Sequence, residues 1–249
     1  MDMAIIVPSR ARPENFRRLN RLLPTCVLCV DEREREAYAQ VPADRILWHR
    51  PTRTIGEVRQ WVLDHVRAEC VVMVDDDLKG VRPMVGTKRK AITDPADIAA
   101  IIENGARVAA DLGKSVFCWN RNPNPMWFAP HDPFHMVAPV AGAFGVIGRR
   151  LRFDPSLSDG EDVDFCLSAL LHDRVVIADN RFYFDFGSVM AGAGGLQTVR
   201  TQELMLADRR KLEERWGQSV SLIGKPTAGR AGKKVATRGM RMSIRVKRR

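Results

Sequence analysis

The sequence runs Val71-Val72-Met73-Val74-Asp75-Asp76-Asp77-Leu78 at the point that decides the fold. An uninterrupted apolar run rich in β-branched residues predicts a strand buried on both faces, as in parallel sheets. Open α/β sheets bind ligands beside the carboxyl ends of their strands, where these acids would lie. Three adjacent carboxylates repel one another, and Mg²⁺ or Mn²⁺ bound through oxygen would remove that repulsion. The stretch therefore predicts a metal–carboxylate site, with a solvated acidic turn as the alternative.

Composition and pattern favour one globular α/β domain. The chain has 249 residues, of which 45% are hydrophobic and 28% charged. Strands and helices alternate, which predicts a single domain over residues 1–224 with a mostly parallel central sheet flanked by helices. The chain has neither an apolar run of the roughly 18 residues that cross a membrane nor a signal-peptide pattern at its start, so we expect a soluble protein.

Five cysteines, an odd number, sit mostly inside apolar runs. Cys26 and Cys29 have the spacing of a zinc-binding pair, but residues three apart in a strand face opposite sides. No second Cys/His pair completes such a site. The cysteines are therefore expected to be reduced core thiols in a cytoplasm.

The net charge of +10 is concentrated in residues 225–249, which contain ten Lys and Arg residues and no acid. A basic tail of this kind attracts polyanions, most commonly nucleic acid. The alternative is a disordered, solubilising terminus. The candidate nucleic-acid-binding residues of the tail are Lys233, Lys234, Arg238 and Arg241.

Upstream of the acidic stretch, three segments offer ligand-binding groups. A strand over residues 3–7 is followed by the loop Pro8-Ser9-Arg10-Ala11-Arg12, whose arginines are placed to meet phosphates. Asp31 ends a second strand, where it would bind the base or ribose of a nucleotide, or simply cap the next helix. Arg59 lies on the polar side of the helix that leads into the acidic strand, where it is either solvated or directed at the site.

Residues 120–135 are rich in Pro, Asn and aromatic residues, which predicts a functional surface loop. His131 and His135 have the spacing of a helical metal pair, but the nearby prolines argue against a helix. A glycine-punctuated β segment follows at 137–148, and Gly142 within it would let a ligand approach the backbone closely.

A second acidic cluster, Asp159-Gly160-Glu161-Asp162-Val163-Asp164, precedes an apolar helix. The helix macrodipole favours one or two acids in a first turn, and four in six residues exceed that need. One of them could act as general base toward an incoming hydroxyl. Two late strands, at 174–178 and 182–186, are expected after this helix, and the second contains Asp185 among aromatic residues.

Five segments in order resemble GT-A fold glycosyltransferases: Val-Pro-Ser-Arg, Ile-Gly-Glu-Val-Arg, Val-Asp-Asp-Asp, Gly-Ala-Phe-Gly-Val and Gly-Glu-Asp-Val-Asp-Phe. The resemblance covers roughly residues 3–217. It implies a GT-A (Rossmann-like) fold and an Mn²⁺ or Mg²⁺ ion held against a nucleotide-sugar, with a UDP-sugar as the expected donor. The implied metal ligands are Asp77 and Asp75, with Asp185 near the place of a late histidine. Glu161 and Asp162 match the acidic pair and are the implied catalytic residues, with Asp162 as the base of an inverting enzyme. The implied donor-binding residues are Pro8, Ser9, Arg10, Arg12, Asp31, Arg59, Asp75, Asp76 and Gly142.

The opening Ile-Ile-Val-Pro-Ser-Arg-Ala-Arg-Pro-Glu-Asn is similar, more narrowly, to the TET-associated glycosyltransferases of bacteriophages. That resemblance implies transfer to 5-hydroxymethylcytosine or another hydroxymethylpyrimidine in DNA, in the host cytoplasm. The basic tail fits such an acceptor, since ten cations can displace counterions from phosphates. Trp127, Phe128 and Phe134 would stack a displaced base or pack on the core.

Three other functions compete with this one. A glycosyltransferase acting on a surface glycan or lipid carrier would use the tail on anionic headgroups. A nucleotidyltransferase would carry a glycine-rich first loop, which this chain lacks. A non-catalytic nucleic-acid-binding protein is the third alternative. The two acid clusters at strand and helix ends argue against it, because they would repel DNA.

Overall fold

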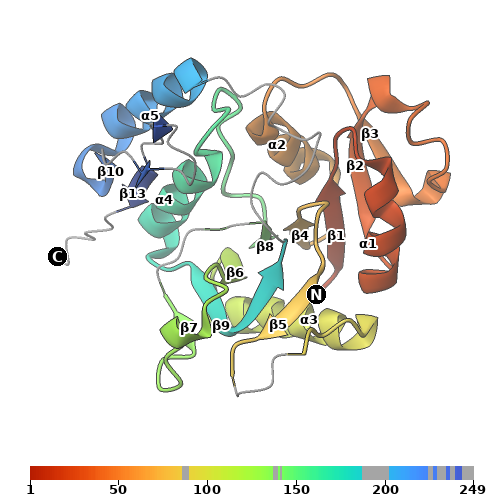
Figure 1. Ribbon diagram of the computed structural model, residues 1–249, viewed down its shortest axis with the longest axis horizontal. Coiled ribbons are helices and arrows are strands. Elements are labelled where there is room, and N and C mark those ends of the chain that lie inside the picture. The colour runs from red at the N-terminus through yellow and green to blue at the C-terminus, as the bar shows by residue number, and fades with distance from the viewer. Residues whose placement is uncertain are drawn as a thin grey trace.

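The structure is a computed structural model. It describes residues 1–85, 90–136, 140, 142–186, 202–223, 227–228, 234–235 and 239–242. A central sheet has the strand order β3-β2-β1-β4-β8-β6-β9-β5, with the short β7 beside β9 (Figure 1). Its strands are β1 (Met3–Pro8), β2 (Val27–Asp31), β3 (Ile46–His49), β4 (Cys70–Val74), β5 (Gly80–Pro83), β6 (Val116–Asn120), β7 (Phe134–His135), β8 (Ala143–Ile147) and β9 (Ile177–Asp185).

Helices flank this sheet, and their starts follow local sequence signals. The Thr54 side chain accepts the Glu57 N–H to cap one helix, and Asp94 caps another that has Pro95 in its first turn. The α-helices are α1 (Phe16–Leu22), α2 (Ile55–His65), α3 (Pro95–Asp111), α4 (Glu161–Asp173) and α5 (Gln202–Trp216). The 3₁₀ turns are η1 (Pro13–Asn15), η2 (Glu32–Glu34), η3 (Ala43–Arg45), η4 (Pro125–Trp127) and η6 (Gly217–Ser219).

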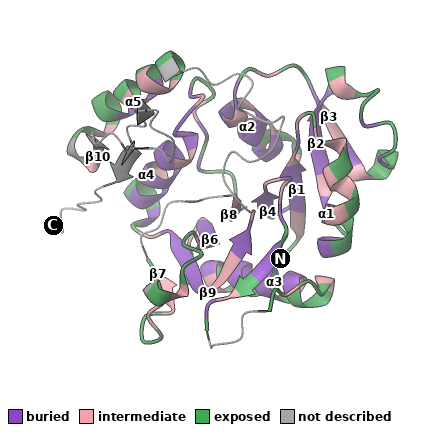
Figure 2. Cartoon of the chain, viewed as in Figure 1, coloured by how far each residue is buried: buried purple, intermediate pink, exposed green. Residues whose placement is uncertain are grey.

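The apolar side chains of β4 fill cores on both faces of the sheet. Val72 and Val74 join the core that includes residues of α1 and α3. Val71 and Met73 join the core that includes residues of α2 and α4. Buried strands therefore lie between helices whose outer surfaces are exposed (Figure 2). The expectation of a strand buried on both faces before the acids is confirmed.

The predicted α/β class is confirmed, but the sheet is mixed rather than mostly parallel. Strands β3, β2, β1 and β4 run parallel to one another, whereas β8 runs antiparallel to both β4 and β6. An apolar pattern does not encode strand direction, so the sequence could not reveal this. The two late strands expected at 174–178 and 182–186 form one strand, β9, whose pairing with β6 shifts register between Trp119 and Asn120.

Parts of the basic segment 225–249 form short paired strands. Strand β13 (Gly239–Met242) pairs antiparallel with β10 (Val220–Ile223), and β11 (Thr227–Ala228) pairs with β12 (Lys234–Val235). Lys234 and Arg241 thus lie in short strands, while Lys233 and Arg238 lie outside the described residues. No helix in the described ranges is long and apolar enough to span a membrane.

Candidate active site

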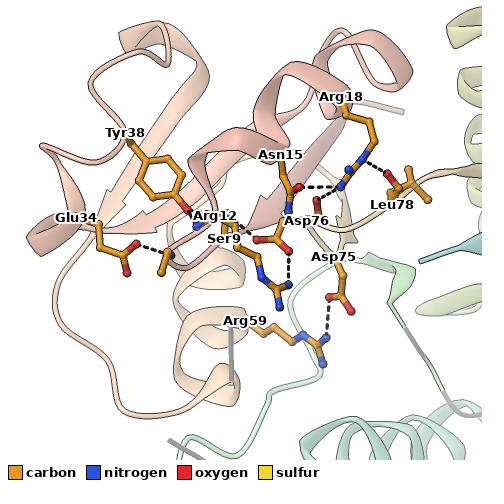
Figure 3. Close-up of polar contacts among 11 residues, drawn as sticks. Ser9, Arg12, Asn15, Arg18, Glu34, Tyr38, Arg59, Asp75, Asp76 and Leu78 are labelled. Atoms are coloured by element: carbon orange, nitrogen blue, oxygen red, sulfur yellow. Dashed lines mark hydrogen bonds and ion pairs between the residues drawn. The ribbon is translucent and has the colours of Figure 1, made fainter. Parts of the chain in front are cut away.

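The acidic triplet divides its side chains between two sides of the sheet edge. Asp75 and Asp76 follow the last residue of β4, and their carboxylates bond to different partners. Asp76 is buried, and its carboxylate accepts bonds from Ser9 Oγ at 2.7 Å and from Arg12 Nη1 at 3.0 Å. Asp75 faces α2, with its Oδ1 3.5 Å from Arg59 Nη2 (Figure 3).

Asp76 holds the loop between β1 and α1. Ser9 Oγ also lies 2.8 Å from the hydroxyl of buried Tyr38, which accepts the Arg12 backbone N–H at 3.1 Å. From α1, Arg18 Nε donates to the Leu78 carbonyl at 2.8 Å and so holds the chain beyond the triplet. The predicted donor-binding residues Ser9, Arg12 and Asp76 therefore lie together. Asp76 is committed to this network and does not face Arg59.

Arg59 joins the two acidic segments. Its side chain is 7% exposed, which excludes the solvated alternative and leaves the one in which Arg59 is directed at the site. Arg59 Nη1 donates to Glu161 Oε1 at 2.9 Å, and the guanidinium lies 5.2 Å from the Phe144 ring centre. Although burial opposes the charge, Glu161, Asp75 and Asp162 together raise the pKa of Arg59. The buried cation thus gathers carboxylates from the ends of β4 and from the start of α4.

Asp75 and Asp77 are the carboxylates of the triplet that remain available. The Asp75 side chain is 45% exposed. Loss of hydration, opposed by Arg59 and reinforced by the Asp77 and Asp76 charges, raises the pKa of Asp75 to about 6. Partial burial and the Asp76 charge also raise the pKa of Asp77. Both shifts indicate negative charge that the protein itself does not fully neutralise.

The second acidic cluster is held mainly by α5. Arg209 Nε donates to Asp159 at 3.1 Å, and Arg215 Nη1 donates to Asp164 at 2.8 Å. The buried Asp208 carboxylate accepts the Ser158 backbone N–H at 2.7 Å. Asp162, which is partly exposed, accepts the Val163 N–H and forms no ion pair within the described ranges. Asp162 is therefore the acid of this cluster that structural contacts leave for chemistry.

Two predicted site residues are engaged elsewhere. Hydrogen bonding by Arg33 to the Asp31 carboxylate lowers the pKa of Asp31 to about 2. Asp185 lies beside the turn after the triplet, because its carbonyl accepts the Lys79 N–H, yet its carboxylate accepts Arg82 Nε at 2.7 Å. Within the described part of the chain, no three His, Cys, Asp or Glu side chains form a metal-binding group. A nucleotide-binding role for Asp31 and a metal-ligand role for Asp185 stay predictions.

Gly142 leaves room for Asp75 and Phe186, and its role in donor binding stays a prediction. A Cβ at this position would lie 2.7 Å from the Phe186 ring and 2.9 Å from Asp75 Oδ2. The Gly142 carbonyl accepts the Asp75 N–H at 2.7 Å. Gly142 therefore sets the position of Asp75.

All five cysteines are free and buried, so they belong to the core as expected. Cys26 and Cys29 belong to cores on opposite faces of the sheet. His135 lies in β7, not in a helix. Sequence reasoning missed Tyr38, Arg18 and Asp208, and no motif in the chain marks them.

The fold is that of GT-A glycosyltransferases. Glucosyl-3-phosphoglycerate synthase from Mycobacterium tuberculosis, solved with Mg²⁺ and UDP, is similar with a TM-score of 0.53 and 13% identity, over 90% of this chain and 82% of that one. TarS 1–349 from S. aureus is 14% identical over 74% of this chain (TM-score 0.45). A mannosyltransferase from Pyrobaculum calidifontis, solved with GDP-Man and Mn²⁺, is 14% identical over 72% (TM-score 0.47). The chain spans only 60% and 54% of these last two proteins.

The family follows from the sequence match. The TET-associated glycosyltransferase family matches residues 3–195, most of the chain and all of the acidic segments described above. The chain belongs to this family and is a glycosyltransferase. No curated protein matches it.

Proposed function

We propose that this enzyme transfers a sugar from a nucleotide-sugar, with UDP as the preferred nucleotide, to the hydroxyl of a hydroxymethylated pyrimidine in DNA. The observation that carries the proposal is the contact of Arg59 with both Asp75 and Glu161. This contact brings Asp75, an expected metal ligand, close to Glu161 in the segment that contains the expected base. All five cysteines are free, which suits action in a reducing cytoplasm.

The donor side is built from the end of β4 and the first loop. Asp75 and Asp77 fit a divalent cation, because Mg²⁺ and Mn²⁺ sites use one or two carboxylates together with substrate phosphates and water. The raised pKa of each carboxyl shows a charge that such an ion would neutralise. The ion would stabilise the departing diphosphate. Arg12, oriented by Asp76, would supply a cation for the phosphates of the donor.

The acceptor side is the start of α4. Asp162 accepts the proton of the acceptor hydroxyl. The oxygen of that hydroxyl forms a bond to the sugar carbon, while the bond between this carbon and the diphosphate breaks. Arg59 fixes Glu161, so Glu161 orients the first turn of α4 and does not exchange the proton. Attack opposite the leaving group would invert the anomeric configuration.

DNA as the acceptor is supported by the family's association and by the charge of the chain. Ten Lys and Arg residues lie between 225 and 249 without an acid. Binding through phosphate contacts falls steeply with salt, in proportion to the number of contacts. Since β13 pairs with β10, replacing Lys233, Lys234, Arg238 and Arg241 by Gln tests this better than deleting the segment. The replacement should flatten the salt dependence of DNA binding.

The decisive experiment incubates the enzyme with radiolabelled sugar nucleotides and matched hydroxymethylated and plain DNA, with and without Mn²⁺. Label on hydroxymethylated DNA alone, and only with the metal, is the expected result. Parallel incubations contain a glycan or a lipid-linked acceptor; label on one of these with none on DNA would rule out DNA as the acceptor. Transfer undiminished by chelation would remove the metal.

A further inference from the structure

The loop between β1 and α1 contains a residue in a strained conformation. Ala11 has a φ of 53°, in the left-handed region where the Cβ of an alanine crowds a neighbouring carbonyl oxygen. Arg174 also has a positive φ, but it ends α4, and that conformation is common at helix ends. Ala11 instead lies inside a loop at the edge of the sheet that carries the acidic triplet, because β1 is parallel to β4. Strain of this kind persists only where the surrounding structure holds it, and it is concentrated at functional sites.

One short segment beyond β2 holds this loop. The Ala11 N–H donates to Glu34 Oε2 at 2.6 Å. The next N–H, that of Arg12, donates to the hydroxyl of Tyr38 at 3.1 Å (Figure 3). Glu34 and Tyr38 are themselves joined, because the Tyr38 N–H donates to the Glu34 carbonyl at 3.1 Å. A single turn over residues 34–38 therefore offers an acceptor to each of two consecutive N–H groups.

The Tyr38 hydroxyl also closes a ring of hydrogen bonds. Ser9 Oγ uses its hydrogen to donate to Asp76 at 2.7 Å, so the Tyr38 hydroxyl donates to Ser9 Oγ at 2.8 Å. Asp76 in turn accepts from Arg12 Nη1 at 3.0 Å. Arg12 is thus bound at both ends, its backbone by Tyr38 and its guanidinium by Asp76. Tyr38 is only 1% exposed, so its ring cannot move away from the loop without leaving the core.

We propose that Tyr38 is a positioning residue of the donor site: its hydroxyl keeps the strained loop in the conformation in which Arg12 meets the diphosphate of the nucleotide-sugar. The inference rests on the proposed function, in which Arg12 binds those phosphates. Asp76 lies between Asp75 and Asp77 in the chain, so the guanidinium that it holds is next to the expected metal ligands. A loop that is fixed before the donor arrives loses less entropy when the donor binds. Tyr38 should therefore affect donor affinity and not the rate of transfer from bound donor.

The test compares Tyr38→Phe with wild type, because this change removes the hydroxyl and keeps the buried ring. The Kd of UDP with Mn²⁺, measured by calorimetry well below the unfolding midpoint, should rise about tenfold, the size of effect expected for one or two lost hydrogen bonds. In transfer assays KM for the donor should rise likewise, while kcat stays within about twofold. The control is Tyr183→Phe, the chain's other tyrosine, which pairs with Arg82 of β5 at the far end of the strand order from β2. It should leave the Kd of UDP unchanged.

Relief of the strain supplies a second test. Glycine adopts a positive φ readily, so Ala11→Gly lets the loop keep its conformation with less support. The double variant that combines Ala11→Gly with Tyr38→Phe should therefore bind UDP more tightly than Tyr38→Phe alone. A tyrosine that only stabilised the core would lower the free energy of unfolding and leave the Kd of UDP as in wild type.

Equal Kd values for wild type and Tyr38→Phe, or a loss confined to kcat, would overturn the inference. So would a double variant that binds UDP no better than Tyr38→Phe. If wild type binds no UDP, with or without Mn²⁺, the proposed donor fails, and the role of Tyr38 fails with it. The Kd comparison needs no acceptor, so it distinguishes a failure of this role from a failure of DNA as the acceptor.

Discussion

Asp75 and Asp76 are consecutive in the chain, yet their carboxylates bond to different parts of the molecule. Asp76 is bound by Ser9 and Arg12 of the first loop, whereas Asp75 is bound by Arg59 of α2. One acid therefore maintains the structure, and its neighbour faces the site. Substitution of Asp76 should therefore destabilise the fold, and substitution of Asp75 should not.

Asp76→Asn should destabilise the fold. The change removes the charge that Arg12 pairs with and weakens a buried hydrogen bond. A hydrogen bond to a charged group contributes about 1.5–3 kcal/mol, and we expect a loss of that size in the free energy of unfolding. Urea unfolding measures it. Asp75→Asn is the matched control and should not destabilise; equal losses in the two variants would contradict the division of roles.

Stability should fall as pH rises through the titration of Asp75. Its pKa is raised from 3.8 to about 6 in the folded protein, so the folded state binds more protons between these values. The free energy of unfolding contributed by this group is therefore highest below the lower value and is lost by the upper one. From about pH 4.5 to about pH 7, Asp75→Asn should gain unfolding free energy, measured with urea, relative to wild type, because the variant lacks the group whose contribution is lost over this range. An identical change with pH in the two proteins would refute the shift.

Arg59→Ala should be the most destabilising change at the site. It leaves Glu161 and Asp75 without their buried cation, and removing one partner of a buried ion pair costs about 3–5 kcal/mol. The control is Arg53→Ala, because the Arg53 side chain is 92% exposed and pairs with Glu57 at the surface. Exposed pairs contribute about 0–1 kcal/mol. Thermal unfolding of both variants compares them, and similar midpoints would argue against a buried role for Arg59.

Asp162→Asn should separate chemistry from binding. General base catalysis contributes about 10²–10⁴-fold, so kcat should drop within that range. Donor affinity, measured by calorimetry, should be retained, because Asp162 forms no ion pair within the described ranges. Asp164→Asn is the contrasting variant: Asp164 bonds to Arg215 and Trp216, so it should lose stability instead. Transfer near the wild-type rate by Asp162→Asn would exclude it as the base.

Gly142→Ala should impair activity more than stability. The added methyl would press on Asp75 Oδ2 and on the Phe186 ring, displacing a carboxylate of the site. Gly145→Ala is the comparison, because its methyl would collide with the Phe117 ring inside the core. That variant should chiefly lose stability. Measuring kcat and the free energy of unfolding for both variants checks this difference.

The sequence located the acids but not the groups that assign their roles. A buried apolar run followed by Asp75, Asp76 and Asp77 was enough to place a strand end and a ligand-binding edge. The convergence of Asp75 with Glu161 depends on Arg59, whose burial no helical periodicity indicates. The Tyr38 hydroxyl also comes from a segment without any chemical motif. Such side chains are chosen by tertiary packing, which becomes visible only when distant segments are placed together.

Helix α5 has a practical consequence for dissecting this enzyme. The family match ends at residue 195, whereas α5 begins at Gln202 and supplies Arg209, Arg215 and Asp208 to the segment that leads into α4. A fragment trimmed to the matched residues would keep every recognisable motif and still lose the scaffolding beneath its base. A fragment whose boundaries are chosen from homology alone would thus contain every motif and still lack activity.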